Sequence, residues 1–204
     1  MNEIEIAIKH ADIQLVNADL LLLKHAAGFH GADHVVAEAL CRQAGELSLE
    51  TIAASVESDG YALVAGNGAI QAKNVLFVKT APIPQLRYDQ IYEFVGNALR
   101  IAADVAGESS HVAMTIHCVG YGLNAATVFL AQLAGIIEAI GLGAIPAGLK
   151  GISIVDLDPD TASYLAELLA MRFKAEPYVR QSVTGNIIYL DAGKLQGMYQ
   201  DATS

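Results

Sequence analysis

The sequence predicts an α/β fold of three layers, in which a mixed central sheet lies between two layers of helices. Short, continuously apolar runs alternate along the chain with longer segments whose apolar residues repeat every three or four positions. Hydrophobic residues make up 53% of the 204 residues and charged residues only 17%, which indicates a deeply buried core. No long Pro-, Gly- or Ser-rich linker interrupts the sequence, so residues 1–204 are expected to form a single domain.

Eight short segments are expected to be extended. Residues 3–8 alternate polar and apolar side chains, which is typical of a half-buried strand. Residues 20–23 are a run of four leucines, which suits a strand buried on both faces. The last segment, 187–190, is expected at an edge of the sheet. The remaining candidates are residues 12–16, 61–64, 75–78, 111–116 and 152–155.

Four segments are expected to be helices. The first runs from Ala32 to about Ala44, and the second presents an apolar stripe over residues 88–102. The third carries an apolar face from Phe129 to Ile140 and ends at the glycines and proline of residues 141–146. The fourth begins within residues 158–161, and its residues expected to point inward are Tyr164, Leu165, Leu168 and Leu169.

Charge and targeting signals restrict the partners and the cellular location that are expected for this protein. Twelve basic and 22 acidic residues give a net charge of −10, which argues against DNA, RNA or an anionic membrane as partner. A single phosphate group is still allowed, because backbone N–H groups at a helix start bind anions without Lys or Arg. The longest uncharged stretch, residues 124–137, is too short to span a membrane, and no secretory signal is evident. Two distant cysteines exclude a disulfide framework, and a cytoplasmic location is expected.

Two Gly-rich loops, each between a predicted strand and a predicted helix, are the candidate ligand-binding segments. In the first, residues 25–35, Gly28 and Gly31 permit positive φ and close backbone approach. The N–H groups of Gly31, Ala32 and Asp33 are expected to point outward and to hold a phosphate. The alternative is an ordinary strand-to-helix turn, with Asp33 acting only in the first helical turn.

The second loop, residues 115–125, has the same position relative to its strand and helix. Gly120, Tyr121, Gly122 and Leu123 are expected to line the other side of a diphosphate, and Asn124 to cap the following helix. The alternative is that Tyr121 is a half-buried loop aromatic.

Several titratable residues surround these loops. His25, His30 and His34 are expected to bond to a ligand or to loop backbone, since no third ligand follows at metal-binding spacing and no metal is predicted. His117 precedes Cys118, which is interpreted as a buried apolar residue rather than a nucleophile. Three basic residues lie near strand ends or helix starts and are either solvated or phosphate-binding: Lys24, Lys79 and Arg87.

The order of these segments resembles the macrodomain family. The pattern begins with Ala11-Asp12-Ile13-Gln14, places a second Asp at Asp19, and continues through the leucine strand to Gly31-Ala32-Asp33. Further on, NVLFVKTAP, a helix opening at Tyr88, HVAMTIHCVGYGL and ISIVDLD follow in the family's order. The resemblance covers about residues 12–171 and leaves residues 174–204 as a C-terminal extension.

Macrodomains bind ADP-ribose and related molecules, and the resemblance implies a macrodomain-like fold with the following roles. Asp12 contacts the adenine amino group, with Ile13 beside it, and Asp156 lies near the adenine or ribose edge. The residues along the two faces of the diphosphate are Gly31, Ala32 and Asp33 on one side and Gly120, Tyr121 and Gly122 on the other.

Three functions are consistent with this reading. The first is binding or sensing of ADP-ribose or another NAD-derived or adenine nucleotide, without a cofactor and with self-association allowed. The second is hydrolysis of an ADP-ribosyl or nucleotide bond by water activated by Asp33, His30 or His117. The family's hydrolytic Asn is absent from Lys24 to Ala27, and Gly120-Tyr121-Gly122 replaces its Gly-X-aromatic-Gly. The third is a scaffold with a degenerate pocket, since fold alone does not fix function.

Overall fold

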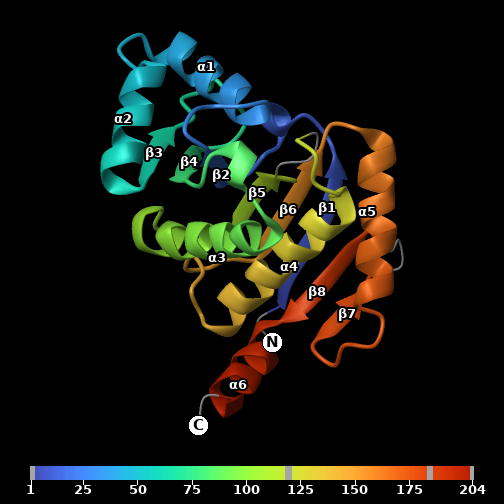
Figure 1. Cartoon of the computed structure of the whole chain (residues 1–204). Coiled ribbons are helices and arrows are strands. Elements are labelled where there is room, and N and C mark those ends of the chain that lie inside the picture. Colours follow the sequence, from blue (N-terminus) through green and yellow to red (C-terminus); the bar gives the residue numbers. More distant parts are fainter. Residues whose placement is uncertain (1–2, 118–120, 183–185, 203–204) are drawn as a thin grey trace.

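The computed structural model describes residues 3–117, 121–182 and 186–202 and contains one eight-stranded sheet with helices on both sides (Figure 1). The strand order is β3-β4-β2-β5-β6-β1-β8-β7. The strands are β1 (Glu3–His10), β2 (Leu20–His25), β3 (Tyr61–Ala65), β4 (Asn74–Lys79), β5 (His111–Thr115), β6 (Gly151–Asp156), β7 (Val179–Gln181) and β8 (Ile187–Asp191). The helices are α1 (Ala32–Ala44), α2 (Leu49–Asp59), α3 (Tyr88–Val105), α4 (Ala125–Gly141), α5 (Pro159–Arg172) and α6 (Ala192–Ala202).

The sheet is mixed, as the sequence predicts. Its five central strands, β4, β2, β5, β6 and β1, are parallel, while β3 at one side and β8 and β7 at the other are antiparallel to their neighbours. All six residues of β2 are buried, as expected for a central strand covered on both faces. The parallel arrangement places the carboxyl ends of β2, β5, β6 and β1 at one edge of the sheet.

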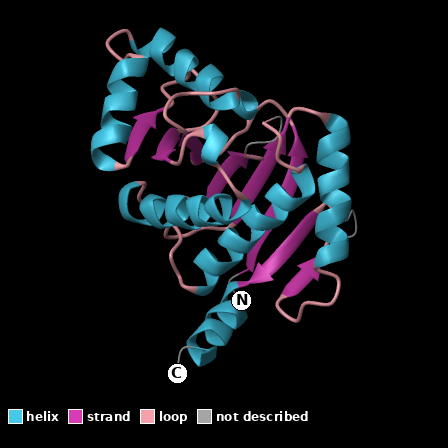
Figure 2. Ribbon diagram, in the orientation of Figure 1, coloured by secondary structure: helices cyan, strands magenta, loops and turns pink. Residues whose placement is uncertain are grey.

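Two apolar cores separate the three layers, which Figure 2 shows as helices on either side of the strands. One core packs α3, α4 and α5 against alternate residues of the sheet, through side chains such as Leu99, Ile136 and Leu165. The other packs α1 and α2 against the opposite face, through Leu40, Val56 and Phe77. The three-layer prediction is therefore confirmed.

Three local predictions were wrong. Residues 12–16 are not extended, because the Asp12 side chain accepts a bond from the Gln14 N–H and starts a short 3-10 helix over Ile13–Leu15. Tyr164 does not point inward and is 50% exposed. The strand β8 is not at the edge, because the short β7 pairs with it on the outside.

Two helices lie outside the predicted set. In α2 only Ile52 and Val56 are buried, so its apolar periodicity is too short to stand out in the sequence. The C-terminal α6 extends away from the sheet (Figure 1) and contacts α4, where Gly141 accommodates the Tyr199 ring. A Cβ at Gly141 would lie 2.3 Å from that ring.

Hydrogen bonds at the amino ends of the strands hold together the edge of the sheet opposite the carboxyl ends. Asp19 accepts bonds from the Ser110 N–H at 2.9 Å, the Ser110 hydroxyl at 2.6 Å and the His111 N–H at 3.0 Å. Lys73 Nζ also donates to Asp19 at 2.6 Å. These donors hold the pKa of the Asp19 carboxyl well below its usual range, so this end of the sheet is stabilised by an ionised side chain.

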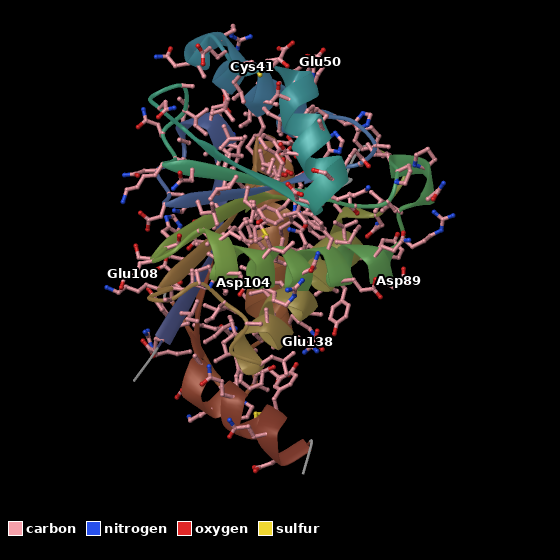
Figure 3. All side chains as sticks on the ribbon, turned by 90° about the vertical axis from the view of Figure 1, so that its left-hand side faces the viewer. Cys41, Glu50, Asp89, Asp104, Glu108 and Glu138 are labelled. Atoms are coloured by element: carbon pink, nitrogen blue, oxygen red, sulfur yellow. The ribbon has the colours of Figure 1, made fainter. Side chains whose placement is uncertain are left out.

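Acidic side chains lie on the exterior of the helical layers. Figure 3 labels Glu50 on α2 and Asp89 and Asp104 on α3, and all three are exposed. None of the helices in the described ranges combines the length and the apolar character needed to cross a lipid bilayer.

Candidate functional site

A cavity of about 660 Å³ lies at the carboxyl edge of the parallel strands. This volume is typical of sites for small ligands and cofactors. Its walls come from the ends of β2, β5 and β6, the turn after β1 and the start of α1. The lining residues are Ala11, Asp12, Ile13, Gln14, Lys24, His30, Gly31, Ala32, Val35, Thr115, Ile116, Tyr121, Val155, Asp156 and Leu157.

The start of α1 forms one wall of this cavity. Gly31 is the N-terminal cap with φ +57°, a backbone conformation that L side chains rarely adopt, and no side chain caps this helix. Gly31 and Ala32 line the cavity, as predicted. The Asp33 N–H instead donates to the His30 carbonyl at 3.3 Å, so it closes the turn rather than pointing outward.

Tyr121 brings the second loop against the first. A Cβ built on Gly31 would lie 3.7 Å from the Tyr121 hydroxyl, and the rings of His30 and Tyr121 are 6.4 Å apart in an edge-on arrangement. Asn124 caps α4 by accepting a bond from the Thr127 N–H at 3.1 Å, as predicted. Gly120 and Cys118 lie outside the described residues. Gly122 and Leu123 are not among the described residues that line the cavity.

A buried ion pair joins β2 to α1 at the base of this cavity. Lys24 Nζ donates a hydrogen bond to Asp33 Oδ2, and the side chains of Lys24 and Asp33 are only 7% and 1% exposed. Burial raises the pKa of the Asp33 carboxyl, and the Lys24 ammonium beside it opposes that rise. Asp33 Oδ1 has no hydrogen-bond partner within the described part of the chain. Lys24 lines the cavity, whereas Asp33 is buried and is not among the described lining residues.

Two of the predicted histidines are core residues. His25 is 3% exposed and His117 is 1% exposed, and neither is among the described lining residues. Their rings pack edge-on against Phe29 and Phe94, each at 4.8 Å between centroids. Burial holds the pKa of His117 well below its usual range and also lowers that of His25, so burial favours neutral rings.

Of the remaining predicted residues in the first loop, some line the cavity and others do not. His30 lines the cavity, whereas Gly28 does not. His34 pairs instead with Glu38 at 3.1 Å along α1. Within the described ranges, no group of three His, Cys, Asp or Glu side chains is placed to hold a metal ion.

Two carboxylates, those of Asp12 and Asp156, line the cavity. Asp12 lines it while capping the 3-10 helix. Asp156 lines it at the end of β6, and burial raises the pKa of its carboxyl. Asp156 also accepts a bond from the Asp158 N–H at 2.8 Å.

Sequence reasoning missed several residues that shape the site. Val35 and Leu157 line the cavity and are 43% and 70% exposed, so they form an apolar part of its mouth. Gln132 is fully buried in α4, and its side chain joins the His117 N–H to the Thr115 carbonyl. A glutamine in an otherwise apolar helical face is the signal that could have identified this anchor.

Of the other two basic candidates, Lys79 pairs with Glu57, and Arg87 donates to the Pro84 and Leu86 carbonyls.

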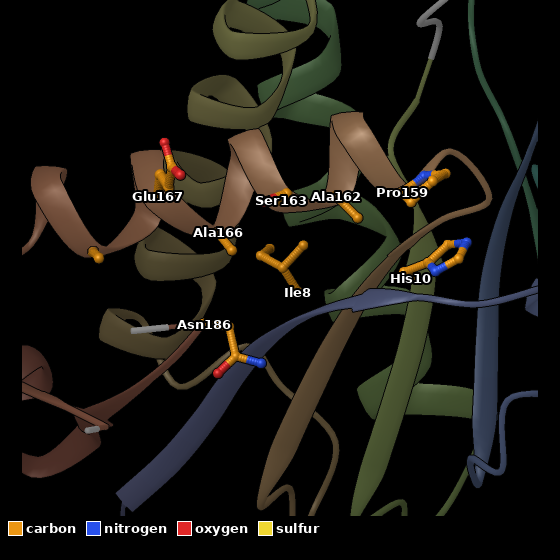
Figure 4. Close-up of a pocket in the computed structure, with 9 residues that line it drawn as sticks. Ile8, His10, Pro159, Ala162, Ser163, Ala166, Glu167 and Asn186 are labelled. Atoms are coloured by element: carbon orange, nitrogen blue, oxygen red, sulfur yellow. The ribbon is translucent and has the colours of Figure 1, made fainter. Parts of the chain in front are cut away.

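A second cavity, of about 510 Å³, lies between α5 and β1 (Figure 4). Its wall on α5 consists largely of alanines, and its titratable lining residues, His10 and Glu167, are exposed. It contains none of the predicted site residues.

Comparison with known proteins identifies solved structures that share this fold. No protein-family model matches the sequence, and no curated protein matches it. Solved macrodomain structures do match the fold. The Oceanobacillus iheyensis macrodomain with MES bound aligns at a TM-score of 0.62 with 14% identity, covering 84% of this chain and 97% of that one. The Trypanosoma brucei macrodomain in complex with ADP-ribose aligns at 0.58 with 16% identity, covering 78% and 67%.

A third match is the macro domain of ganglioside induced differentiation associated protein 2, at a TM-score of 0.58 and 13% identity, covering 80% of this chain and 83% of that one. The chain therefore has the macrodomain fold, as the resemblance in the sequence predicts.

Proposed function

We propose that this protein binds ADP-ribose or a related adenine nucleotide in the 660 Å³ cavity. The observation that carries the proposal is the composition of that cavity. Two aspartates, an uncapped helix start and an aromatic side chain, taken from segments far apart in the sequence, line one space. The fold supports the same ligand, because the Trypanosoma brucei neighbour is a complex with ADP-ribose.

The proposed orientation follows from the charges of the walls. The diphosphate lies against the start of α1 at Gly31 and Ala32, where the helix dipole and free N–H groups favour an anion. Lys24 is the lysine that lines the cavity in the described structure, and its ammonium offsets part of the ligand charge. The adenine amino group donates to Asp12, and Tyr121 covers the middle of the ligand.

Binding is favoured over the two alternatives. An open cavity beside Gly31 argues against a scaffold with a filled, degenerate pocket. For hydrolysis, Asp33 and His117 are buried and are not among the described lining residues, so only His30 of the three candidates lines the cavity. Product analysis after prolonged incubation with ADP-ribose separates a binding protein, which leaves the ligand intact, from a hydrolase.

A matched pair of cap variants tests the binding proposal. Asp12→Asn keeps an oxygen that can cap the 3-10 helix but removes the carboxylate from the cavity. Asp158→Asn makes the same change at the cap of α5, where Asp158 is not a lining residue. In calorimetric titrations with ADP-ribose, Asp12→Asn should weaken binding by roughly tenfold or more, and Asp158→Asn should leave it unchanged. Equal affinities for both variants and the native chain would rule out the proposed adenine contact.

A further inference from the structure

Lys24 provides something that nucleotide binding does not require, namely a buried primary amine on the cavity wall. An arginine would supply the same positive charge with better geometry for phosphate. Lys24 is 6% exposed, yet it is one of the residues that line the cavity. A lysine on a cavity wall presents a primary amine, the nucleophile that forms Schiff bases with carbonyl compounds.

The position of Lys24 relates its amine to the anion-binding turn. Its Nζ donates to Asp33, which follows Gly31 and Ala32 directly in the first turn of α1. A phosphate held by the N–H groups of that turn therefore lies close to the amine. In an open-chain pentose 5-phosphate the aldehyde carbon is at the opposite end of the five-carbon chain from the carbon that carries the phosphate. The chain can therefore bring that aldehyde to Nζ while the phosphate stays at the turn.

We propose that Lys24 forms a reversible imine with the aldehyde carbon of an open-chain sugar phosphate held at the start of α1. The chemical class is a phosphorylated sugar with a free anomeric carbon, and ADP-ribose belongs to it. The choice of ADP-ribose as one probe rests on the proposed function, whereas the amine chemistry does not.

The step needs no oxidant or metal. The ammonium of Lys24 first passes a proton to Asp33 Oδ2, and the neutral amine attacks the aldehyde carbon. A C–N bond forms while the carbonyl electron pair moves to oxygen, which takes the proton from Asp33. Asp33 then accepts a proton from the nitrogen and returns it to the hydroxyl, which leaves as water while the nitrogen lone pair forms the C=N bond. Amine and aldehyde thus give a protonated imine and water, and Asp33 is again ionised.

The surroundings of Asp33 suit this exchange of a proton. Burial raises the pKa of its carboxyl, which makes a protonated Asp33 accessible beside the amine. A proton moved from Lys24 to Asp33 also converts a buried ion pair into two neutral groups, and this reduces the cost of desolvation. The neighbouring His117 ring is fully buried, and its pKa is held well below its usual range, so it adds no competing positive charge.

Other lysines provide the contrast. Lys79 ends the adjacent strand β4, pairs with Glu57 and is 46% exposed, and it is not among the residues that line the cavity. Lys73 is 73% exposed and pairs with Asp19. Both ammonium groups are exposed to solvent and neither is among the described lining residues, so both are expected to react only at the background rate of a surface lysine.

Reductive trapping tests the proposal on the full chain. The protein is incubated with ADP-ribose or ribose 5-phosphate and cyanoborohydride, and the adduct is measured by intact mass and located by peptide mapping. ADP, which has no free anomeric carbon, is the negative probe. Lys24 should gain the mass of the sugar less one oxygen at least about tenfold faster than Lys79.

Two variants sharpen the result. Lys24→Arg keeps the charge and can pair with Asp33 but has no primary amine, so trapping should fall to background. Lys79→Arg is the matched control and should be trapped like the native chain. If Lys24→Arg fails to fold, the mapped ratio of Lys24 to Lys79 in the native chain still decides the question.

The inference and the proposed function fail in different ways. Tight binding of ADP-ribose with an adduct spread evenly over the lysines overturns the imine and leaves the binding function standing. Selective trapping of ribose 5-phosphate at Lys24 without measurable binding of ADP-ribose supports the imine and overturns the proposed nucleotide-binding function. An adduct at Lys24 with ADP would overturn the proposed aldehyde chemistry.

Discussion

Lys24, in the penultimate position of β2, donates a hydrogen bond to Asp33 in the first turn of α1, and both side chains are buried. This contact joins the central strand to the helix whose start forms one wall of the cavity proposed to bind the ligand. The pair therefore fixes the position of Gly31 and Ala32 relative to the sheet. It also supplies the positive charge on the cavity wall.

Removing the lysine should leave a buried carboxylate without its cation. Lys24→Met is expected to lower the free energy of unfolding by about 3–5 kcal/mol at pH 7. Without the cation, the pKa of Asp33 rises further, so the loss should shrink as the pH falls towards ~4, where the unfolded carboxyl also takes up its proton. Urea unfolding at several pH values measures this. The double variant Lys24→Met/Asp33→Leu should recover most of the loss, and equal instability of the two variants would contradict the account.

Asp19 should stabilise the fold only while it is ionised. Its donors hold the pKa of the folded carboxyl well below its usual range, so its contribution is complete above about pH 4 and is lost as the pH falls further. Asp19→Asn should lower the free energy of unfolding by about 1–3 kcal/mol at pH 7. The variant should also lose less stability than the native chain as the pH falls below about 4. Thermal unfolding between neutral pH and pH 2 tests this. If the variant loses as much stability in acid as the native chain, carboxyl groups other than Asp19 are responsible for that loss.

His117 should make the protein less stable in mild acid. Burial holds the pKa of the His117 ring in the folded chain well below its usual value. In mild acid the unfolded chain therefore binds a proton at this ring that the folded chain does not bind. Stability should therefore fall as the pH drops below about 6.5. His117→Phe should fit against Phe94 and give a shallower slope between pH 6.5 and 4.5. Parallel slopes for the native chain and the variant would indicate that the ring titrates normally.

A close crossing of α3 and α4 should be intolerant of a methyl group. A Cβ at Gly135 would lie 2.5 Å from the Tyr92 carbonyl oxygen. Gly135→Ala should therefore destabilise the chain by about 1–3 kcal/mol. Gly197→Ala in α6, where a Cβ would meet nothing within 4 Å, is the control and should leave stability unchanged or slightly higher. Chemical unfolding of both variants makes the comparison, and similar losses for both would contradict the packing argument.

The fold was predictable where apolar periodicity was strong. The buried leucines of β2 and the stripe of α3 are recognisable because packing repeats over many positions. Weakly periodic elements were not found: α2 buries two residues, and β7 has three residues, too few for a pattern. Pairing of β7 outside β8 depends on contacts between distant segments, which local sequence does not encode.

The site was predictable in part for the same physical reason. Glycines at a strand-to-helix turn pointed to Gly31, whereas Asp12 was indicated only by the resemblance to macrodomains and its cap of the 3-10 helix was not predicted. Burial of His25, Asp33 and His117 could not be predicted, because a titratable residue next to a loop looks the same in sequence whether it faces a ligand or the core. The partner of Lys24 lies nine residues away on another element, so only the fold brings the pair together.

A crystal structure of the protein grown with millimolar ADP-ribose tests the central claim most directly. We expect density for the diphosphate against the N–H groups of Gly31 and Ala32, with the adenine beside Asp12. Density for the nucleotide in the cavity between α5 and β1, or an empty site at Gly31 despite saturating ligand, would contradict it.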